Sequence, residues 1–483
     1  MRVLLISSYT MGYVTRTDIS PPLSLLTIAA SMRLHGHEPK LLDLNTVAVP
    51  DDVDREDWYV KSILTEIEDF KPGMVGINCM LTANFPFVRK AAQAIKAEHR
   101  RLPVAIGGIH PTLYHQRIIE ECPEIDAIAL GEGEEQAIAM CDAFEKKDRS
   151  LLDGVGSIAW RDDFGFPRIS PRSKNFIENL DDFPDPAWDL VHLPDYFTDH
   201  STWYNPRKLD IKMSVPIQSS RACPFDCNFC SAASMMGRGL RLRSAKRVVD
   251  EMQGLYEKHG LTYFGFVDDI LTVNKKHILG ICEEIVRRGL VFQFESFNGY
   301  NLKSLDRDII GAMVEAGMVY AILPLEHGND AMRTRIIGGG KRLPEDKIYQ
   351  VREIYREHDL LTRAVFIMGF PEDTHDTLQD TYDMITKLEC DINNVFSLIP
   401  FPGTKLFNQA VAENLFLGEM NFDDFWKGEM DLNALQKVFY IKPYNLDEDE
   451  LWEWRQKFDA VRLYSERVRK LGRGKNGEYA AAI

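Results

Sequence analysis

Short apolar runs alternate with amphipathic stretches along the first 150 residues. We expect β-strands at five apolar runs, namely Arg2–Ser7, Pro39–Asp43, Met74–Asn78, Pro103–Gly107 and Ala127–Leu130. Between these runs, apolar residues recur at helical spacing, for example in Leu23–Leu34 and Phe87–His99. Strands that alternate with helices predict an α/β fold with a doubly wound parallel sheet, whose ligands bind beyond the carboxyl ends of the strands.

This alternation stops in residues 151–210, which are rich in proline, aspartate and aromatic residues. A short hairpin is expected at Ser157–Ile169, with turn residues at its centre. Glycine and serine are scarce, and the aromatic side chains favour burial. The composition therefore predicts a packed connector and not a flexible linker.

A second series of alternating strands and helices begins at Val215. Its six predicted strands are Val215–Ser219, Tyr263–Val267, Val291–Ser296, Val319–Leu325, Thr362–Met368 and Asn393–Leu398. Helices fit between them at Ala245–Lys258, Lys275–Arg288, Asp306–Glu315, Glu345–Glu357 and Thr377–Leu388. Six such units predict a partial, TIM-like (βα)6 barrel.

Chain length supports several domains, because 483 residues exceed one ordinary core. We expect a Rossmann-like domain in 1–150, a connector in 151–210, the partial barrel in 211–402 and a mostly helical region in 403–483.

Composition and charge exclude some classes of protein. A net charge of −16 argues against a nucleic-acid binder. The apolar runs are too short or interrupted to span a bilayer, and no secretory signal pattern is seen, so we expect a cytoplasmic protein. One basic stretch, Arg238–Arg247, is either a solvated helix start or a contact for carboxylates of a ligand.

Three of the eight cysteines stand together in the string RACPFDCNFC as Cys223, Cys227 and Cys230. The other five are isolated and are expected to be buried thiols. Three thiolates can hold three irons of a cubane and leave the fourth iron open, whereas structural zinc needs a fourth ligand. The CxxxCxxC spacing therefore favours a catalytic iron–sulfur cluster on the loop after the first barrel strand.

This spacing, with aromatic Phe229 before the last cysteine, resembles the radical S-adenosylmethionine superfamily over roughly Val215 to Thr404. The resemblance implies a 4Fe-4S cluster bound by the three cysteines, whose open iron binds S-adenosylmethionine and generates a 5′-deoxyadenosyl radical. The protein then supplies binding, orientation and exclusion of side reactions.

The same resemblance implies cofactor contacts at several strand ends. Phe229 matches a residue near the adenine, and Asp268 and Asp269 match contacts to the methionine amino group. Glu295 and Glu326 are candidates for the ribose or the ammonium group, and Met368 and Gly369 resemble the adenine-supporting strand. Each acidic residue also has a simpler interpretation as a helix cap or a solvated loop residue.

Two glycine-containing loops in the first domain, GGIHPT and LGEGE, follow the fourth and fifth predicted strands. Together with their place before the cysteine loop, they resemble the cobalamin-binding domain of cobalamin-dependent radical enzymes. The residues so implicated are Gly107, Gly108, His110, Thr112, Gly131, Glu132 and Gly133. No Asp-x-His-x-x-Gly motif supplies a histidine below the cobalt, so the lower ligand stays open, and His110 is alternatively a structural residue.

The combined resemblance implies a cobalamin-dependent methyltransferase that methylates an unactivated carbon of a small molecule. It also implies an electron donor such as flavodoxin or ferredoxin. An oxidative cyclase acting on a tetrapyrrole-like substrate, similar to the anaerobic magnesium-protoporphyrin monomethyl ester cyclase, is an alternative. A non-catalytic cobalamin or iron–sulfur sensor is a further alternative.

Overall fold

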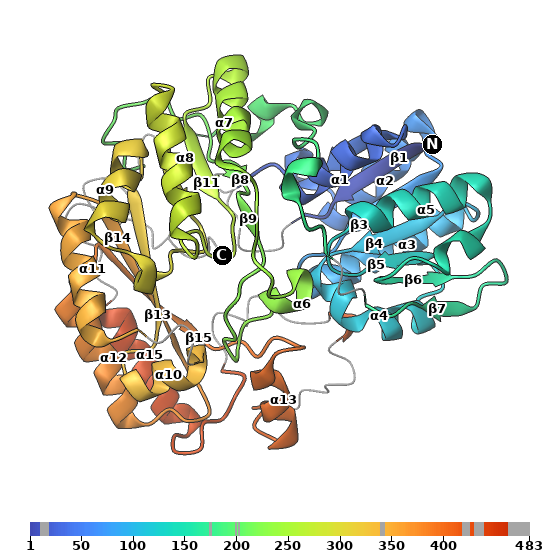
Figure 1. The fold of residues 1–483 in the computed structure, drawn as a ribbon. Helices are drawn as coiled ribbons and strands as arrows, with labels where there is room; N and C mark the ends of the chain where they lie inside the picture. The colour runs from blue at the N-terminus through green and yellow to red at the C-terminus, as the bar shows by residue number, and fades with distance from the viewer. Residues whose placement is uncertain are drawn as a thin grey trace. The chain divides into compact units, whose positions relative to one another are not determined.

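The chain folds into two compact units in the computed structural model (Figure 1). The structure describes residues 1–9, 19–172, 176–198, 200, 203–338, 343–417, 426–428 and 439–461. Met1–Tyr196 form the first unit with Ser234–Gly237 and residues 426–428, and the other described residues form the second unit. The predicted domain boundaries at residues 150, 210 and 402 stay predictions.

A seven-stranded sheet organises the first unit. Its order is β2-β1-β3-β4-β5-β6-β7, and the strands are β1 (Arg2–Ser7), β2 (Glu38–Asp43), β3 (Met74–Asn78), β4 (Val104–Gly107), β5 (Ala127–Ala129), β6 (Ile158–Arg161) and β7 (Pro167–Ile169). The first five are parallel, and the hairpin of β6 and β7 adds two antiparallel strands at the edge. The predicted doubly wound sheet and its hairpin are confirmed.

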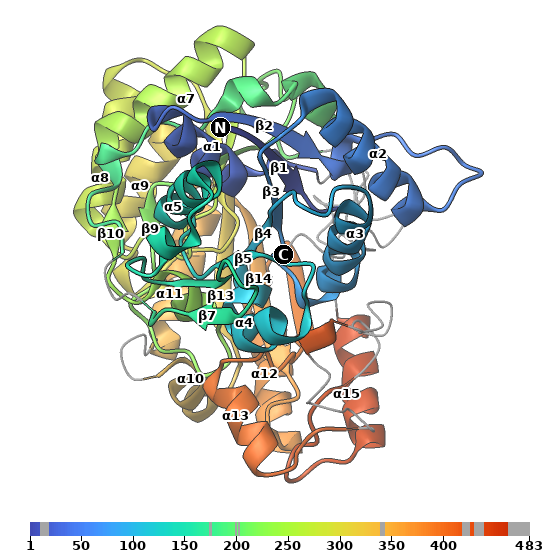
Figure 2. The same ribbon diagram turned by 90° about the vertical axis from the view of Figure 1, so that its right-hand side faces the viewer.

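Helices cover both faces of this sheet because alternate residues of its buried strands point to opposite sides. Leu4 and Ile6 pack with residues of α2 (Arg55–Phe70), α3 (Phe85–Glu98) and α4 (Ile109–Glu121). Val3 and Leu5 pack with α1 (Leu23–Leu34) and α5 (Glu134–Lys146) on the other face (Figure 2). The core of this unit therefore has two layers, one on each side of the sheet.

Six parallel strands form the open barrel of the second unit. They are β8 (Val215–Ile217), β11 (Tyr263–Phe266), β12 (Gln293–Ser296), β13 (Tyr320–Glu326), β14 (Leu361–Met368) and β15 (Ile392–Ser397). They pair in two groups of three, and a parallel bridge between Phe294 and Met318 joins the groups. The predicted (βα)6 arrangement is confirmed.

The barrel helices begin and end where the sequence chemistry indicates. They are α7 (Ala245–His259), α8 (Lys275–Arg287), α9 (Arg307–Ala316), α10 (Asp330–Ile337), α11 (Glu345–Glu357) and α12 (His375–Leu388). The Ser244 side chain accepts a hydrogen bond from the Arg247 N–H and caps α7, and Gly260 ends that helix in the left-handed conformation with a φ of 67°. Serine at a helix start and glycine at a helix end are residue types that favour these two caps.

The late part of the chain contributes helices α13 (Lys405–Ala412) and α15 (Glu448–Ala460) to the second unit. Residues 418–425, 429–438 and 462–483 of the predicted helical region lie outside the described residues. Among the helices of the described ranges, none combines the length and the apolar character that crossing a membrane requires.

Candidate active site

The three cysteines lie on a loop that follows the first barrel strand, as predicted. The short strands β9 (Ser220–Arg221) and β10 (Arg241–Leu242) pair antiparallel and close the base of this loop. None of the three forms a disulfide bond with another described residue; Cys230 is exposed, and Cys223 and Cys227 are partly buried. Ala222, directly before Cys223, has a φ of 73°, a conformation that turns the chain sharply into the loop.

Backbone contacts anchor the centre of the cysteine loop at Asn228. Its N–H donates to the Ile336 carbonyl at the end of α10, and its own carbonyl accepts from the Leu406 N–H, both at 2.9 Å. Asp226 forms ion pairs with Arg238 and Lys405 on the loop surface. These contacts position the loop against two separate helices of the second unit.

The basic stretch near this loop is largely paired within the protein. Arg238 pairs with Asp226, Arg243 with Glu251 at 2.6 Å, and Lys246 with Asp250 at 2.7 Å. Three basic residues of the stretch thus have carboxylate partners within the protein, and a contact with carboxylates of a ligand stays a prediction.

Asp268 and Asp269 close the second barrel strand but have different surroundings. Asp268 is fully buried, and its carboxylate accepts hydrogen bonds from the Ser219 N–H at 3.0 Å and the Ser219 hydroxyl at 2.7 Å. The Ser220 hydroxyl also donates to it. Asp268 therefore ties the end of β11 to the segment that leads into the cysteine loop, and its predicted contact with S-adenosylmethionine stays a proposal.

Asp269 presents the better placed carboxylate for a ligand. Its Oδ2 atom is buried and has no hydrogen-bond partner among the residues that the structure describes. Burial and the neighbouring charge of Asp268 raise the pKa of Asp269. A buried carboxylate oxygen without a partner is costly to maintain unless a ligand group satisfies it.

Asp269 and Glu326 stand at the ends of the second and fourth barrel strands, on the same rim as the cysteine loop. The pKa of Cys230 is raised by desolvation and further by the negative charges of Cys223, Asp269 and Glu326. Glu326 is buried, follows an irregularity in the register of β13, and has a left-handed φ of 65°. A non-glycine residue in this region is strained, which is frequent at functional sites.

Glu295 lies on the third barrel strand and is also buried. It accepts a hydrogen bond from the Tyr263 hydroxyl at 3.0 Å. This bond satisfies part of its carboxylate within the protein, so a contact with the cofactor ribose or ammonium stays a proposal.

The predicted adenine-supporting segment lies beside the cysteine loop. Met368 ends β14 in a fully buried position, and Gly369 turns the chain with a φ of 94°. The rings of Phe229 and Phe370 meet edge to face with centroids 6.2 Å apart. The structure therefore brings the aromatic residue of the cysteine loop to the end of the fifth barrel strand.

In the first unit, Thr112 joins the two predicted cobalamin loops. Its hydroxyl donates to the Gly108 carbonyl at 2.7 Å and accepts from the Gly131 N–H at 3.0 Å. Gly108 has a φ of 119°, and a Cβ there would lie 2.4 Å from the Cys79 carbonyl oxygen. Gly131 has a φ of 81°, so both loops depend on glycine at the carboxyl ends of β4 and β5.

The remaining predicted residues of these loops have mainly structural contacts. Gly107 ends β4, and Gly133 precedes α5 as its N-terminal cap residue. Glu132 accepts a hydrogen bond from the Ile177 N–H at 3.3 Å. Their contacts with cobalamin stay proposals.

His110 is an interior residue of the first unit. It is fully buried, its Nδ1 lies 3.2 Å from the Thr82 hydroxyl, and its ring stacks near Phe85 and Tyr114. Burial lowers the pKa of His110 to about 3. These surroundings are typical of a structural histidine. A contact of His110 with cobalamin stays a proposal.

Sequence reasoning missed several polar residues that support the site. Ser219 receives a contact from His277 Nε2 at 3.1 Å in addition to its bonds with Asp268. His327 and Asp373 form a buried pair with a separation of 3.0 Å between Nε2 and Oδ1. A local signal existed for Ser219, which ends a predicted barrel strand, and for His327, which follows the predicted strand Val319–Leu325, because polar residues gather at such strand ends. His277 and Asp373 carry no such signal.

Comparisons with known proteins agree with this architecture. Residues 11–140 match the model of the B12 binding domain, and residues 217–385 match the model of the Radical SAM superfamily. The chain is 28% identical over 465 residues to an uncharacterized methyltransferase of Pyrococcus horikoshii, which covers 93% of this chain and 94% of that protein.

A second relative is the anaerobic magnesium-protoporphyrin IX monomethyl ester cyclase of Cereibacter sphaeroides, 29% identical over 357 residues. This match covers 72% of this chain and only 55% of the cyclase. The fold is also that of the radical S-adenosylmethionine methyltransferase TsrM from Kitasatospora setae, solved with cobalamin and an iron–sulfur cluster, with a TM-score of 0.70 and 16% identity. That match covers 95% of this chain and 88% of TsrM.

The donor groups fit the cofactors of these families. Within the described ranges, no three His, Cys, Asp or Glu side chains converge on one metal-ion position. A cubane binds each thiolate to a different iron, so its cysteines surround the cluster and need not meet at one point. The partnerless Asp269 oxygen offers an acceptor for a cationic ligand group. The chain is therefore a cobalamin-dependent radical S-adenosylmethionine enzyme, from the group that includes methyltransferases and the anaerobic cyclase, with a 4Fe-4S cluster, S-adenosylmethionine and cobalamin as cofactors.

Proposed function

We propose that this enzyme transfers a methyl group to an unactivated carbon of a small molecule. The observation that carries the proposal is the loop of three cysteines after the first barrel strand, together with Asp269 and Glu326 at the ends of the second and fourth barrel strands. The buried Oδ2 atom of Asp269 has no hydrogen-bond partner among the described residues. A cluster loop flanked by two acidic groups suits S-adenosylmethionine, whose amino group is cationic. The near end-to-end match with a methyltransferase supports methyl transfer over other outcomes.

Each part of the chain has a defined task in this proposal. Cys223, Cys227 and Cys230 hold the cluster, and Asp269 accepts hydrogen bonds from the ammonium group of S-adenosylmethionine. When bound, the cofactors supply a 5′-deoxyadenosyl radical and a transferable methyl group. Thr112 fixes the two glycine loops that take cobalamin. The substrate must reach both cofactors while water is excluded.

Electrons for the cluster come from outside the chain in this proposal. A small carrier such as flavodoxin or ferredoxin is the expected donor, because reductive cleavage of S-adenosylmethionine consumes one electron. The proposed substrate is a small molecule that accepts the methyl group on an unactivated carbon.

A second candidate function is oxidation with ring formation on a tetrapyrrole-like substrate. The cyclase relative, with 72% of this chain aligned, favours this alternative. The cyclase is considerably longer than the matched part, since only 55% of it aligns. For this reason methylation is the leading proposal.

Anaerobic reconstitution tests the proposal. The reduced enzyme with S-adenosylmethionine is expected to form 5′-deoxyadenosine, and Cys227→Ala is expected to abolish it. Isolated Cys282, which is buried on α8, gives the matched control Cys282→Ala, expected to keep iron and product. A protein that binds cluster and cobalamin but yields no 5′-deoxyadenosine is a sensor, and this result would overturn the proposal.

Product analysis separates methylation from oxidation. Candidate substrates are incubated with the enzyme and S-adenosylmethionine carrying a labelled methyl group. Methylation requires S-adenosylhomocysteine together with 5′-deoxyadenosine and label in the product. Deoxyadenosine alone with an unlabelled, oxidised product would establish the cyclase alternative.

A further inference from the structure

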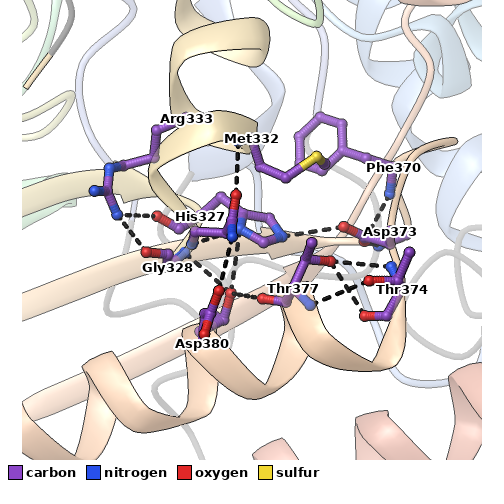
Figure 3. Close-up of polar contacts among 12 residues, drawn as sticks. His327, Gly328, Met332, Arg333, Phe370, Asp373, Thr374, Thr377 and Asp380 are labelled. Carbon is purple, nitrogen blue, oxygen red and sulfur yellow. Dashed lines mark hydrogen bonds and ion pairs between the residues drawn. The ribbon is translucent and has the colours of Figure 1, made fainter.

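Two fully buried side chains, His327 and Asp373, join the loops that follow the fourth and fifth barrel strands (Figure 3). His327 directly follows Glu326, and its Nε2 lies 3.0 Å from Asp373 Oδ1. The other carboxylate oxygen of Asp373 accepts from the N–H groups of Gly369 at 2.7 Å and Phe370 at 3.0 Å. One carboxylate thus connects both loop segments.

The hydrogen bonds of His327 determine its tautomer. The backbone N–H of Asn329 donates to His327 Nδ1 at 3.0 Å, so this nitrogen acts as an acceptor. Nε2 must then carry the proton that is donated to Asp373. A neutral ring with fixed roles for both nitrogens has one orientation.

Neighbouring contacts hold the backbone of the histidine loop from other sides. The Gly328 N–H donates to the Thr381 hydroxyl at 3.0 Å, and a Cβ at Gly328 would lie 2.2 Å from Thr381 Cα. Arg333, itself buried, donates to the His327 carbonyl at 3.1 Å and to the Gly328 carbonyl. The loop is therefore pressed against α12 and has little freedom to shift.

The His327–Asp373 pair links two residues, Glu326 and Phe370, that lie on the cysteine-loop side of the barrel. Glu326, at one end, directly precedes His327 and closes β13 at the carboxyl ends of the barrel strands, where the cysteine loop follows β8. Phe370, at the other end, contacts the ring of Phe229. A displacement of the His327–Asp373 pair would move a charged group and an aromatic group at the barrel rim together.

We propose that the His327–Asp373 pair is a positioning device that sets Glu326 and the Gly369–Phe370 turn for binding of S-adenosylmethionine. Neither side chain touches the cofactor in this role, because both are fully buried. The inference rests on the proposed function of the cluster site. In this role the pair controls how tightly and in which orientation S-adenosylmethionine binds, and the cysteines bind the cluster.

Substitutions of the pair test this role in the reconstituted full-length enzyme. His327→Leu removes the donor, and Asp373→Asn places an amide N–H where an acceptor is needed. Each is expected to raise the KM for S-adenosylmethionine by roughly tenfold or more, with a smaller change in kcat for 5′-deoxyadenosine formation. His327→Gln can still donate to Asp373 and is expected to recover most of the affinity.

Spectroscopy distinguishes positioning from a general loss of structure. Iron content and the electron paramagnetic resonance spectrum of the reduced cluster alone are expected to stay unchanged in the variants. The spectral change on adding S-adenosylmethionine is expected to require higher concentrations. His375, which is exposed and pairs with Glu450 at 3.0 Å, provides the control His375→Gln with wild-type behaviour.

A milder pair of variants covers the case in which His327→Leu does not fold. Thr381→Val removes the acceptor of the Gly328 N–H, whereas Thr381→Ser keeps a hydroxyl. The inference is supported if the KM for S-adenosylmethionine rises in Thr381→Val and not in Thr381→Ser. It is overturned if the folded His327, Asp373 and Thr381 variants all keep the wild-type KM. A wild-type enzyme that makes no 5′-deoxyadenosine would instead refute the proposed function.

Discussion

Substitution of Gly108 by alanine tests the glycine loop at the end of β4. Gly108 has a φ of 119° and a ψ of −175°, a combination accessible almost only to glycine. The added methyl group would lie 2.4 Å from the Cys79 oxygen and 2.7 Å from its carbonyl carbon. Both contacts are with backbone atoms of a neighbouring buried segment, which cannot rotate away.

The expected magnitude has two parts. The unfavourable backbone conformation costs about 1–3 kcal/mol. Forcing the methyl group against the Cys79 backbone adds about 1–3 kcal/mol, as typical for overpacking. A combined loss of about 2–6 kcal/mol is a large share of the roughly 5–15 kcal/mol that stabilises an ordinary domain.

Two glycines of the same unit separate these parts. Gly165 has a φ of 85° with no atom within 4 Å of an added Cβ, so Gly165→Ala reports the backbone cost alone. Gly154 has open space and no positive φ, so Gly154→Ala is expected to change stability by less than about 1 kcal/mol. The expected order of destabilisation is Gly108, then Gly165, then Gly154.

Urea denaturation of the three variants, monitored by circular dichroism, measures these differences. Titration with cobalamin, monitored by absorbance, measures the effect on the proposed cofactor loop. Gly108→Ala is expected to lower the urea concentration at the midpoint of unfolding and to weaken cobalamin binding. A Gly108→Ala protein with the midpoint of Gly154→Ala would refute the steric argument.

Three further predictions concern buried polar groups. Thr112→Val breaks the bonds between the two glycine loops and should weaken cobalamin binding about tenfold, whereas Thr112→Ser should retain it; equal affinities would contradict this. Burial lowers the pKa of His110 from 6.5 to about 3, so stability should fall as pH drops through this window. His110→Phe should flatten that fall in urea midpoints at pH 7 and pH 5, and parallel profiles would disprove it. Asp268→Asn should destabilise the second unit by about 1–3 kcal/mol and lower the iron content. Unchanged stability and iron content would show that the hydrogen bonds from Ser219 and Ser220 to Asp268 do not support the cysteine loop.

Both βα series could be predicted from hydrophobic periodicity because their strands are buried on two faces. The runs at Arg2–Ser7 and Met74–Asn78 coincide with β1 and β3. Continuous apolar character marks a parallel strand, and polar helix faces mark the elements between. Caps such as Ser244 and Gly260 could be predicted for the same local reason, since their chemistry acts within one turn.

The details of the site could not be predicted because they depend on contacts between distant residues. Asp268 and Asp269 are adjacent and chemically identical, yet only the first is enclosed by serine donors. The left-handed turn at Glu326 arises where the register of β13 shifts, and nothing in its local sequence requires it. His327 and Asp373 meet only when neighbouring strands have paired.

The hairpin at the edge of the first sheet affects how the protein behaves in a crowded solution. Strand β7 is the outermost strand beside β6, is only three residues long, and begins with Pro167, which has no N–H. Short edges with proline are poor templates for a further strand from another molecule. The hairpin therefore gives β5 a strand on each side and leaves only a short, proline-containing edge for strand pairing with another molecule.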